Sequence, residues 1–169
     1  MDNVQLDQPA APGHVDFDIK SYAPLLATAY GEAANQDYNS KVRVISTMFN
    51  RALSGKKEFG ADTGKITDVL KGYYAYSKQS PKYQEALSQK FPDKASEDSY
   101  KQIVAITSGI LRGKIDKTPD EFFITPAEAK KTKMNMSLLE KTGSNKVWNF
   151  YRYKPSPATK GKKVNVGVK

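Results

Sequence analysis

Residues 25–34 read Leu-Leu-Ala-Thr-Ala-Tyr-Gly-Glu-Ala-Ala, an apolar run that ends on a single carboxylate, Glu32. Two alanines follow Glu32 in place of a charged helix face. A carboxylate in such a setting is partly desolvated, and desolvation raises its pKa because it disfavours the charged form. We therefore expect Glu32 to hold a proton near neutral pH and to act as a proton donor, the catalytic residue of the chain.

Two helices are expected on either side of the polar segment that follows this run. Ser21 is placed at the cap of the first helix, with Pro24 in its first turn. Ser40 is placed at the cap of the second helix, in which apolar residues recur every three to four positions. The second helix carries Asn50-Arg51 near its end. Packing of the two helices brings an acid beside this pair, an arrangement that indicates a hydrolase.

The rest of the chain alternates short helical and extended patterns. Helices are expected at 66–70, after Ser80-Pro81, from Ser96 to Gly113 and after Thr125-Pro126. Strands are expected at 122–124 and 147–153. A turn at Gly143-Ser144-Asn145 is expected before the second strand. The sequence therefore predicts an α-rich α+β fold with one small sheet. It further predicts an irregular leader at 1–19, one domain at 20–153, and a flexible basic tail at 154–169.

The composition excludes several classes of protein. The chain has 169 residues, enough for one domain, and none of its apolar runs is long enough to span a bilayer. The absence of cysteine excludes a disulfide framework and thiol catalysis. The single histidine, His14, argues against a histidine triad or a multi-histidine zinc site, so we expect no metal and no cofactor. The net charge of +9 favours an anionic partner.

Between residues 20 and 153 the chain carries an ordered series of short motifs. The series is Tyr30-Gly31-Glu32-Ala33, Asn50-Arg51, Val69, Tyr76-Ser77, Leu111-Arg112-Gly113, Asp116-Lys117-Thr118, and Gly143 followed by Phe150-Tyr151. In this order the motifs resemble those of the SleB/CwlJ-like cell wall hydrolases, which share a lysozyme-like or lytic-transglycosylase-like fold. The resemblance implies a single lysozyme-like domain of several helices with a small β-sheet.

The resemblance also implies the chemistry. It makes Glu32 the acid in cleavage of the bond between N-acetylmuramic acid and N-acetylglucosamine, because a protonated carboxyl must meet the leaving oxygen. Hydrolases use a second carboxylate, whereas a lytic transglycosylase closes an internal 1,6-anhydro ring and lets one glutamate act as acid and then as base. Asp37, Asp62 and Asp68 are the nearby alternatives, and none has an apolar setting. The sequence therefore favours a lytic transglycosylase over a muramidase-type hydrolase.

Five residues are candidates for binding the substrate: Asn50, Tyr74, Tyr76, Ser77 and Tyr151. Asn50 is expected to orient Glu32 or the glycan, although it equally fits a helix-capping role. The tyrosines are either stacking platforms for sugars or aromatic residues of the core. Ser77 also fits a role in a turn, and Tyr151 fits packing in the sheet.

Two other functions stay open. The resembling family has Gly-Ala where this chain has Asp120-Glu121, and a histidine that this chain lacks, so a catalytically silent peptidoglycan-binding or virion structural protein is the alternative. The charge and the tyrosines also suggest a nucleic-acid binder. The chain carries no helix-turn-helix, RNA-recognition or finger signature, so no specific nucleic acid is expected.

The expected partners are peptidoglycan glycan strands and, for a virion component, other virion proteins. The expected place of action is the bacterial cell wall or periplasm. The residues after Met1 lack the basic and apolar signal region of an exported protein. We therefore expect a virion-borne or phage-encoded enzyme, an endolysin released through a membrane pore, or an exported protein whose leader has been removed.

Overall fold

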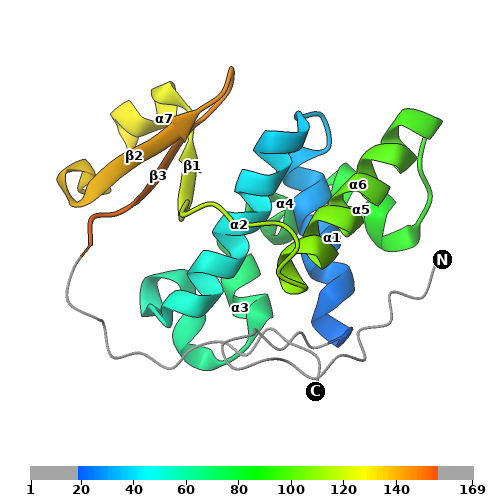
Figure 1. Cartoon of the computed structure of the whole chain (residues 1–169), viewed down its shortest axis with the longest axis horizontal. Helices are drawn as coiled ribbons and strands as arrows, with labels where there is room; N and C mark the ends of the chain where they lie inside the picture. Colours follow the sequence, from blue (N-terminus) through cyan, green and yellow to red (C-terminus); the bar gives the residue numbers. More distant parts are fainter. Residues whose placement is uncertain (1–18, 156–169) are drawn as a thin grey trace.

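A computed structural model describes residues 19–155, with side chains from residue 22 onward (Figure 1). The predicted leader up to residue 18 and the predicted tail from residue 156 lie outside the described residues. The α-helices are α1 (Ile19–Ala33), α2 (Tyr38–Ser54), α3 (Ile66–Leu70), α4 (Tyr74–Ser77), α5 (Pro81–Ser88), α6 (Lys94–Leu111) and α7 (Pro126–Lys131). The strands are β1 (Phe122–Ile124), β2 (Leu139–Ser144) and β3 (Asn149–Tyr153). These elements confirm the expected α-rich α+β class.

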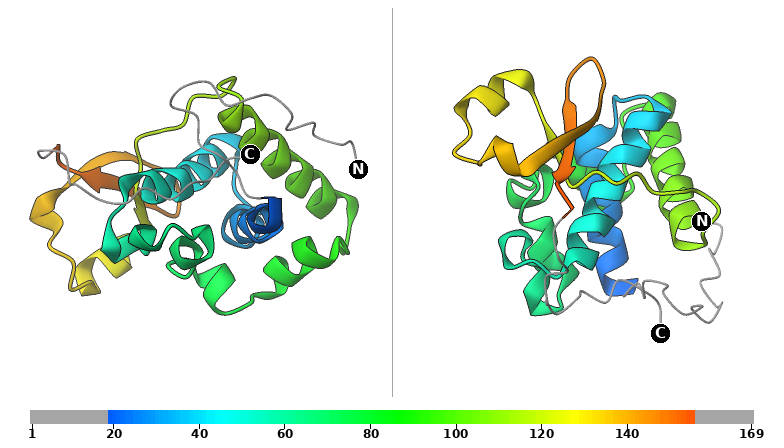
Figure 2. Two further views of the ribbon diagram at one scale, coloured as in Figure 1. Left: turned by 90° about the horizontal axis from the view of Figure 1, so that it is seen from below. Right: turned by 60° about the vertical axis from the view of Figure 1, so that its left-hand side comes forward.

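Helix α1 lies at the centre of the helical part of the molecule. It packs against α2, α3, α4, α5 and α6, and the left view of Figure 2 shows it end-on among them. Every residue from 25 to 30 is buried, as expected for a helix that is apolar on all sides. The one polar side chain in this run, Thr28, donates its hydroxyl to the carbonyl of Pro24 at 2.6 Å. The apolar run therefore forms the core around which the other helices assemble.

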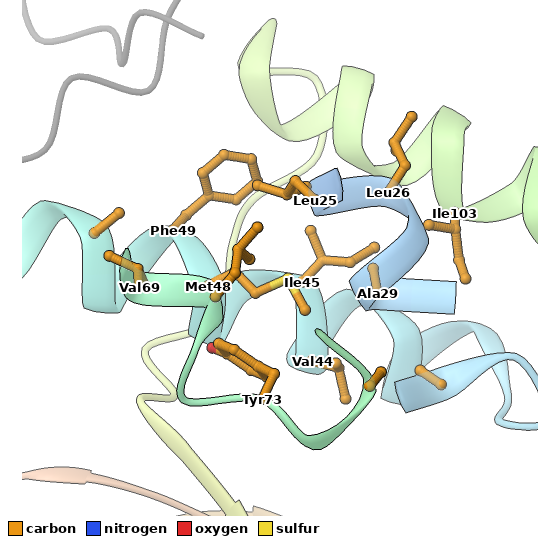
Figure 3. Close-up of a cluster of buried hydrophobic side chains, with 14 of the residues drawn as sticks. Leu25, Leu26, Ala29, Val44, Ile45, Met48, Phe49, Val69, Tyr73 and Ile103 are labelled. Carbon is orange, nitrogen blue, oxygen red and sulfur yellow. The ribbon is translucent and has the colours of Figure 1, made fainter. Parts of the chain in front are cut away.

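A buried apolar interface joins α1 to one face of α2. Figure 3 shows Leu25 and Ala29 of α1 facing Ile45 and Met48 of α2, and all four are completely buried. Helix α2 ends at Gly55, whose positive φ of 67° favours glycine. The spacing of apolar residues in the sequence predicted this buried face.

The predicted starts of the first two helices were wrong. Helix α1 begins at Ile19, so Pro24 lies inside the helix rather than in its first turn. Helix α2 begins after Asp37, whose carboxylate accepts a hydrogen bond from the N–H of Ser40 at 2.8 Å. Ser40 is instead buried, and its hydroxyl accepts a hydrogen bond from the Asn145 side chain at 2.8 Å. Asp37 caps the helix better because its charge also complements the helix dipole.

Helices α5, α6 and α7 also begin with side-chain caps. Ser80 caps α5, as predicted, and Thr125 forms a capping box with Glu128 at the start of α7. Helix α6 begins earlier than predicted, because Asp93 accepts a hydrogen bond from the N–H of Ser96 at 2.7 Å. These caps fix where the three helices begin.

The sheet is antiparallel with strand order β1-β3-β2. Strand β2 was not predicted, and the turn expected at Gly143-Ser144-Asn145 was wrong, because Gly143 and Ser144 belong to β2. The polar residues of β2 lack a clear alternation, and its ladder to β3 is irregular between Lys141 and Gly143. We call residues 122–153 the sheet lobe. Figure 1 shows it as a layer beside the helices.

A buried carboxylate joins the sheet lobe to the helices. Asp120 is 0% exposed and forms an ion pair with Arg43 of α2, with Nη1–Oδ distances of 2.9 and 3.0 Å. The hydroxyls of Thr118 and Thr142 also donate to the Asp120 carboxylate. A Cβ on Gly143 would lie 2.5 Å from the Arg43 guanidinium, so a side chain at this position would push the guanidinium out of its present place. The sheet lobe is therefore anchored to α2 at a fixed position.

Candidate active site

Glu32 lies in the last turn of α1 and is partly buried. One carboxylate oxygen accepts a hydrogen bond from the backbone N–H of Ala75 in α4 at 2.8 Å. Burial raises the pKa of the Glu32 carboxyl, and the negative charge of Glu128 raises it further. The Ala75 N–H and the Arg51 guanidinium act in the opposite direction, but the net shift of the pKa is upward. This direction agrees with the expectation from the apolar sequence around Glu32.

Gly31 allows α4 to approach α1 closely enough to reach Glu32. A Cβ on Gly31 would lie 2.5 Å from the Cβ of Ala75 and 3.2 Å from the Ser80 hydroxyl. With a side chain at this position, the backbone of α4 would have to move away from α1. The hydrogen bond from the Ala75 N–H to Glu32 therefore depends on a glycine at position 31, because only without a side chain there can α4 lie this close to α1.

Arg51 connects Glu32 to the sheet lobe. Its guanidinium carbon lies 4.7 Å from the ring centre of Tyr73, 5.0 Å from that of Phe59 and 5.3 Å from that of Phe122. Its Nε donates to the carbonyl of Glu121 at 2.7 Å. An arginine held against three rings and one carbonyl has little rotational freedom. Its positive charge is therefore fixed at the junction between α2 and β1.

An open groove of about 420 Å³ lies beside Arg51. Its walls come from β1, α7 and the segment after α7, and they combine apolar side chains with charged ones. The lining residues are Arg51, Phe122, Phe123, Ile124, Glu128, Lys131, Thr132 and Met134. Aromatic and aliphatic walls with a few charged groups are typical of sites that bind small polar ligands.

Three of the predicted substrate-binding residues lie on α4, the helix whose N–H binds Glu32. Tyr74 is 70% exposed, directly before Ala75. Tyr76 is partly buried and packs edge-on against Tyr83, with ring centres 5.9 Å apart. Ser77 is exposed, and its hydroxyl donates to a backbone carbonyl of the preceding loop. Of these three, Tyr74 has the exposure that a sugar-stacking platform needs.

The other two predicted substrate-binding residues lie elsewhere. Asn50 donates from its side-chain amide to the carbonyls of Thr118 and Asp120, each at 2.7 Å, and accepts from the Lys117 ammonium at 2.7 Å. These bonds hold the loop before β1, rather than the Glu32 carboxyl or the groove. Tyr151 is partly buried in β3, where it lies opposite Phe122.

Asp120-Glu121, which depart from the pattern of the resembling family, brace the sheet lobe. Asp120 makes the buried ion pair described above, and the Glu121 carboxylate accepts the backbone N–H of Tyr153 at 2.9 Å. The Glu121 carbonyl holds Arg51. Within residues 19–155, no group of three or more histidine, cysteine, aspartate or glutamate side chains has an arrangement that would hold a metal ion.

Sequence reasoning missed Glu128 as a residue of the site. It considered carboxylates near Glu32 in the chain, whereas the carboxylate whose charge reaches Glu32 lies on α7. The available signal was the capping pattern Thr125-Pro126-Ala127-Glu128, which predicts a fixed glutamate at a helix start. That pattern does not reveal which part of the chain α7 faces.

None of the described helices has the combination of length and apolar character required to cross a bilayer. The chain matches no family model, no curated protein and no solved structure. What the protein does must therefore be argued from Glu32, the groove and the residues that connect them.

Proposed function

We propose that the protein cleaves peptidoglycan between N-acetylmuramic acid and N-acetylglucosamine, with Glu32 as the catalytic acid. The observation that carries this proposal is a partly buried carboxyl with a raised pKa, held by a backbone N–H and subject to the charges of Arg51 and Glu128, which line the groove. Cleavage of a glycosidic bond requires such a proton donor. The ordered motifs that resemble SleB/CwlJ-like cell wall hydrolases support the same assignment, including a lysozyme-like fold.

In the first step the Glu32 carboxyl gives its proton to the glycosidic oxygen as the bond to C1 of the muramic sugar breaks. In the transglycosylase route the Glu32 carboxylate then takes the proton of the C6 hydroxyl, whose oxygen bonds to C1. This closes the 1,6-anhydro ring and returns Glu32 to its protonated form without consuming water. The N–H of Ala75 holds the carboxylate between the two steps.

Tyr74 is the best candidate for contact with a sugar ring. Its side chain is exposed and stands next to the residue that anchors Glu32. Aromatic rings bind the apolar faces of sugars, because this contact removes apolar surface of both partners from water. Tyr74 therefore fits a sugar position adjoining the cleaved bond.

The charge of the chain supports an anionic surface as the place of action. A net charge of +9 at pH 7 promotes association with the anionic bacterial wall. We place the activity at the cell wall or periplasm, with glycan strands as partners. A virion-borne enzyme or a released endolysin meets this requirement, and a virion-borne enzyme would also contact other virion proteins.

A non-catalytic peptidoglycan-binding or virion structural protein is the second candidate. The Ala75 N–H favours the ionised form of Glu32, which opposes proton donation. A protein that only binds glycan would retain the groove and Tyr74 but release no product. Product analysis separates this candidate from an enzyme.

The test compares wild type with Glu32→Gln on purified peptidoglycan, with products identified by mass spectrometry. The proposal expects a loss of cleavage of about 100-fold or more, because an amide cannot donate the required proton. Glu85→Gln is the matched control, since Glu85 is another partly buried glutamate and accepts the Tyr30 hydroxyl at 2.9 Å. Equal activity of wild type and Glu32→Gln would refute the catalytic role. Binding of glycan without any product would favour the non-catalytic candidate.

A further inference from the structure

Arg51 presents unused hydrogen-bond donors at the wall of the groove. Its Nε donates to the carbonyl of Glu121 at 2.7 Å, and within residues 19–155 this is the one hydrogen bond of its guanidinium. The guanidinium carbon lies over the rings of Tyr73 and Phe122, at 4.7 and 5.3 Å from their centres. Both Nη groups are therefore left to donate to a ligand from a fixed position. A guanidinium held in this way binds a carboxylate through two parallel hydrogen bonds.

The rest of the lining suits a carboxylate that is joined to small apolar side chains. Lys131 lines the groove from the C-terminal end of α7 and adds a second positive charge. Phe122, Phe123 and Met134 supply apolar surface. The groove therefore combines a binding site for a carboxylate with a wall on which small apolar groups can pack.

Glu128 is the one negatively charged residue of the lining. Its Oε2 accepts the Thr125 N–H at 2.8 Å, and the capping box holds the side chain at the start of α7. A carboxylate has lone pairs for more than one hydrogen bond, so Glu128 can bind a further donor. A ligand that complements the whole groove therefore carries an ammonium group in addition to its carboxylate.

We propose that the groove binds the stem peptide of peptidoglycan, with the C-terminal carboxylate of the peptide on Arg51 and Lys131. This inference rests on the proposed function, because it takes wall glycan as the substrate. A stem peptide ends in alanine residues with a free carboxylate, and in many walls it carries a diamino acid whose side chain ends in an ammonium group. The alanine methyl groups pack on Phe122 and Phe123, and the ammonium group binds Glu128. The enzyme therefore prefers glycan strands that bear peptides.

Tyr73 links the groove to the segment that binds Glu32. Its ring centre lies 4.7 Å from the guanidinium carbon of Arg51 and 6.1 Å from the ring centre of Phe123, and both of these residues line the groove. Tyr73 directly precedes α4, whose Ala75 N–H donates to Glu32. A peptide of about five residues spans up to about 17 Å, whereas the backbone from Tyr73 to Ala75 spans at most about 7 Å. A peptide on a sugar at Glu32 therefore has the length to pass Tyr73 towards the groove.

The first experiment measures the affinity of the protein for three peptides by NMR titration. The probes are Nα-acetyl-L-lysyl-D-alanyl-D-alanine, its C-terminal amide, and the form in which both lysine amines are acetylated. We expect the amide to bind at least about tenfold more weakly, because it lacks the charge that pairs with Arg51. The diacetylated form should bind about threefold more weakly to wild type, and Glu128→Gln should abolish this difference, because the ammonium group loses its partner.

Two lysine variants form a matched pair. Lys131 and Lys133 are both exposed, but only Lys131 lines the groove. Lys131→Gln should weaken binding of the carboxylate-ended peptide by about threefold, and Lys133→Gln should change it by less than about twofold. Arg51→Lys, checked for folding by urea unfolding, should weaken it by at least about tenfold, because lysine cannot form the two parallel bonds. Equal affinity for the acid and the amide, or equal effects of the two lysine variants, would overturn the inference.

The second experiment compares cleavage of wall glycan with cleavage of the same glycan after an amidase has removed its peptides. Wild type should cleave the peptide-bearing strands at least about threefold faster, because binding of a remote group contributes to the rate. Lys131→Gln should lower this ratio, and Lys133→Gln should retain it. Equal rates on both substrates would overturn the inference and leave the role of Glu32 intact. Full activity of Glu32→Gln would instead refute the proposed function, and the peptide affinities, which are measured without cleavage, keep the two failures distinct.

Discussion

Replacing Gly31 with alanine tests why a glycine precedes the Glu32 carboxyl. The added Cβ would lie 2.5 Å from the Cβ of Ala75, and neither atom can rotate away, because each is bonded directly to the backbone. Ordinary contacts between carbon atoms are about 3.5–4.0 Å long. Helix α4 must therefore move away from α1 by about 1 Å. This shift lengthens the hydrogen bond from the Ala75 N–H to Glu32, which is 2.8 Å long in the native chain.

The expected magnitude combines two opposing effects. Overpacking in a rigid contact of this kind costs about 3 kcal/mol. Alanine is favoured over glycine within a helix by about 1 kcal/mol. The free energy of unfolding should therefore fall by about 2 kcal/mol. With a denaturant dependence of about 2 kcal/mol per molar urea, the unfolding midpoint should fall by about 1 M.

The assay is urea unfolding together with peptidoglycan cleavage, measured on Gly31→Ala, Ala75→Gly and the double variant. Ala75→Gly removes the atom that Gly31→Ala would strike, so the double variant should recover most of the lost stability. Its cleavage rate should recover with it, because α4 can return to Glu32. A Gly31→Ala variant more stable than wild type would refute the reasoning. A double variant no better than the sum of its single changes would refute it too.

Two further predictions concern buried charge. Because the folded state raises the pKa of Glu32, its protonated form adds stability below the ordinary carboxyl pKa, and that contribution is lost as pH rises through the raised pKa. Glu32→Gln should therefore unfold at higher urea than wild type at pH 7, with the difference disappearing in acid, and a constant difference across pH would contradict this. Asp120→Asn should lower the free energy of unfolding by about 3 kcal/mol, because it leaves Arg43 without its buried partner. Asp98→Asn, which removes only the exposed pair with Lys94, is the control and should have little effect.

Local features of the site were predictable because they depend on neighbours in the chain. The apolar run before Glu32 indicated a buried helix and a carboxyl with a raised pKa, and the structure has both. Ser80 and Thr125 were expected at helix starts, and they form caps there. The role of Asn50 was not predictable in the same way, because the local sequence does not determine which groups an asparagine near a helix end will bind. Its bonds go to the loop before β1.

The sequence by itself determined the class of the fold, the central helix and the position of one acid at its end. Apolar periodicity and helix capping are properties of short segments, so they can be recognised in the sequence without knowing the tertiary structure. Only the tertiary structure decided that Asp120 pairs with Arg43, 77 residues away, and that the charge of Glu128 acts on Glu32. Such contacts depend on how the sheet lobe packs against the helices, which no local pattern specifies. The sequence therefore pointed to a single acid, whereas the structure adds a groove whose wall includes Arg51 and Glu128.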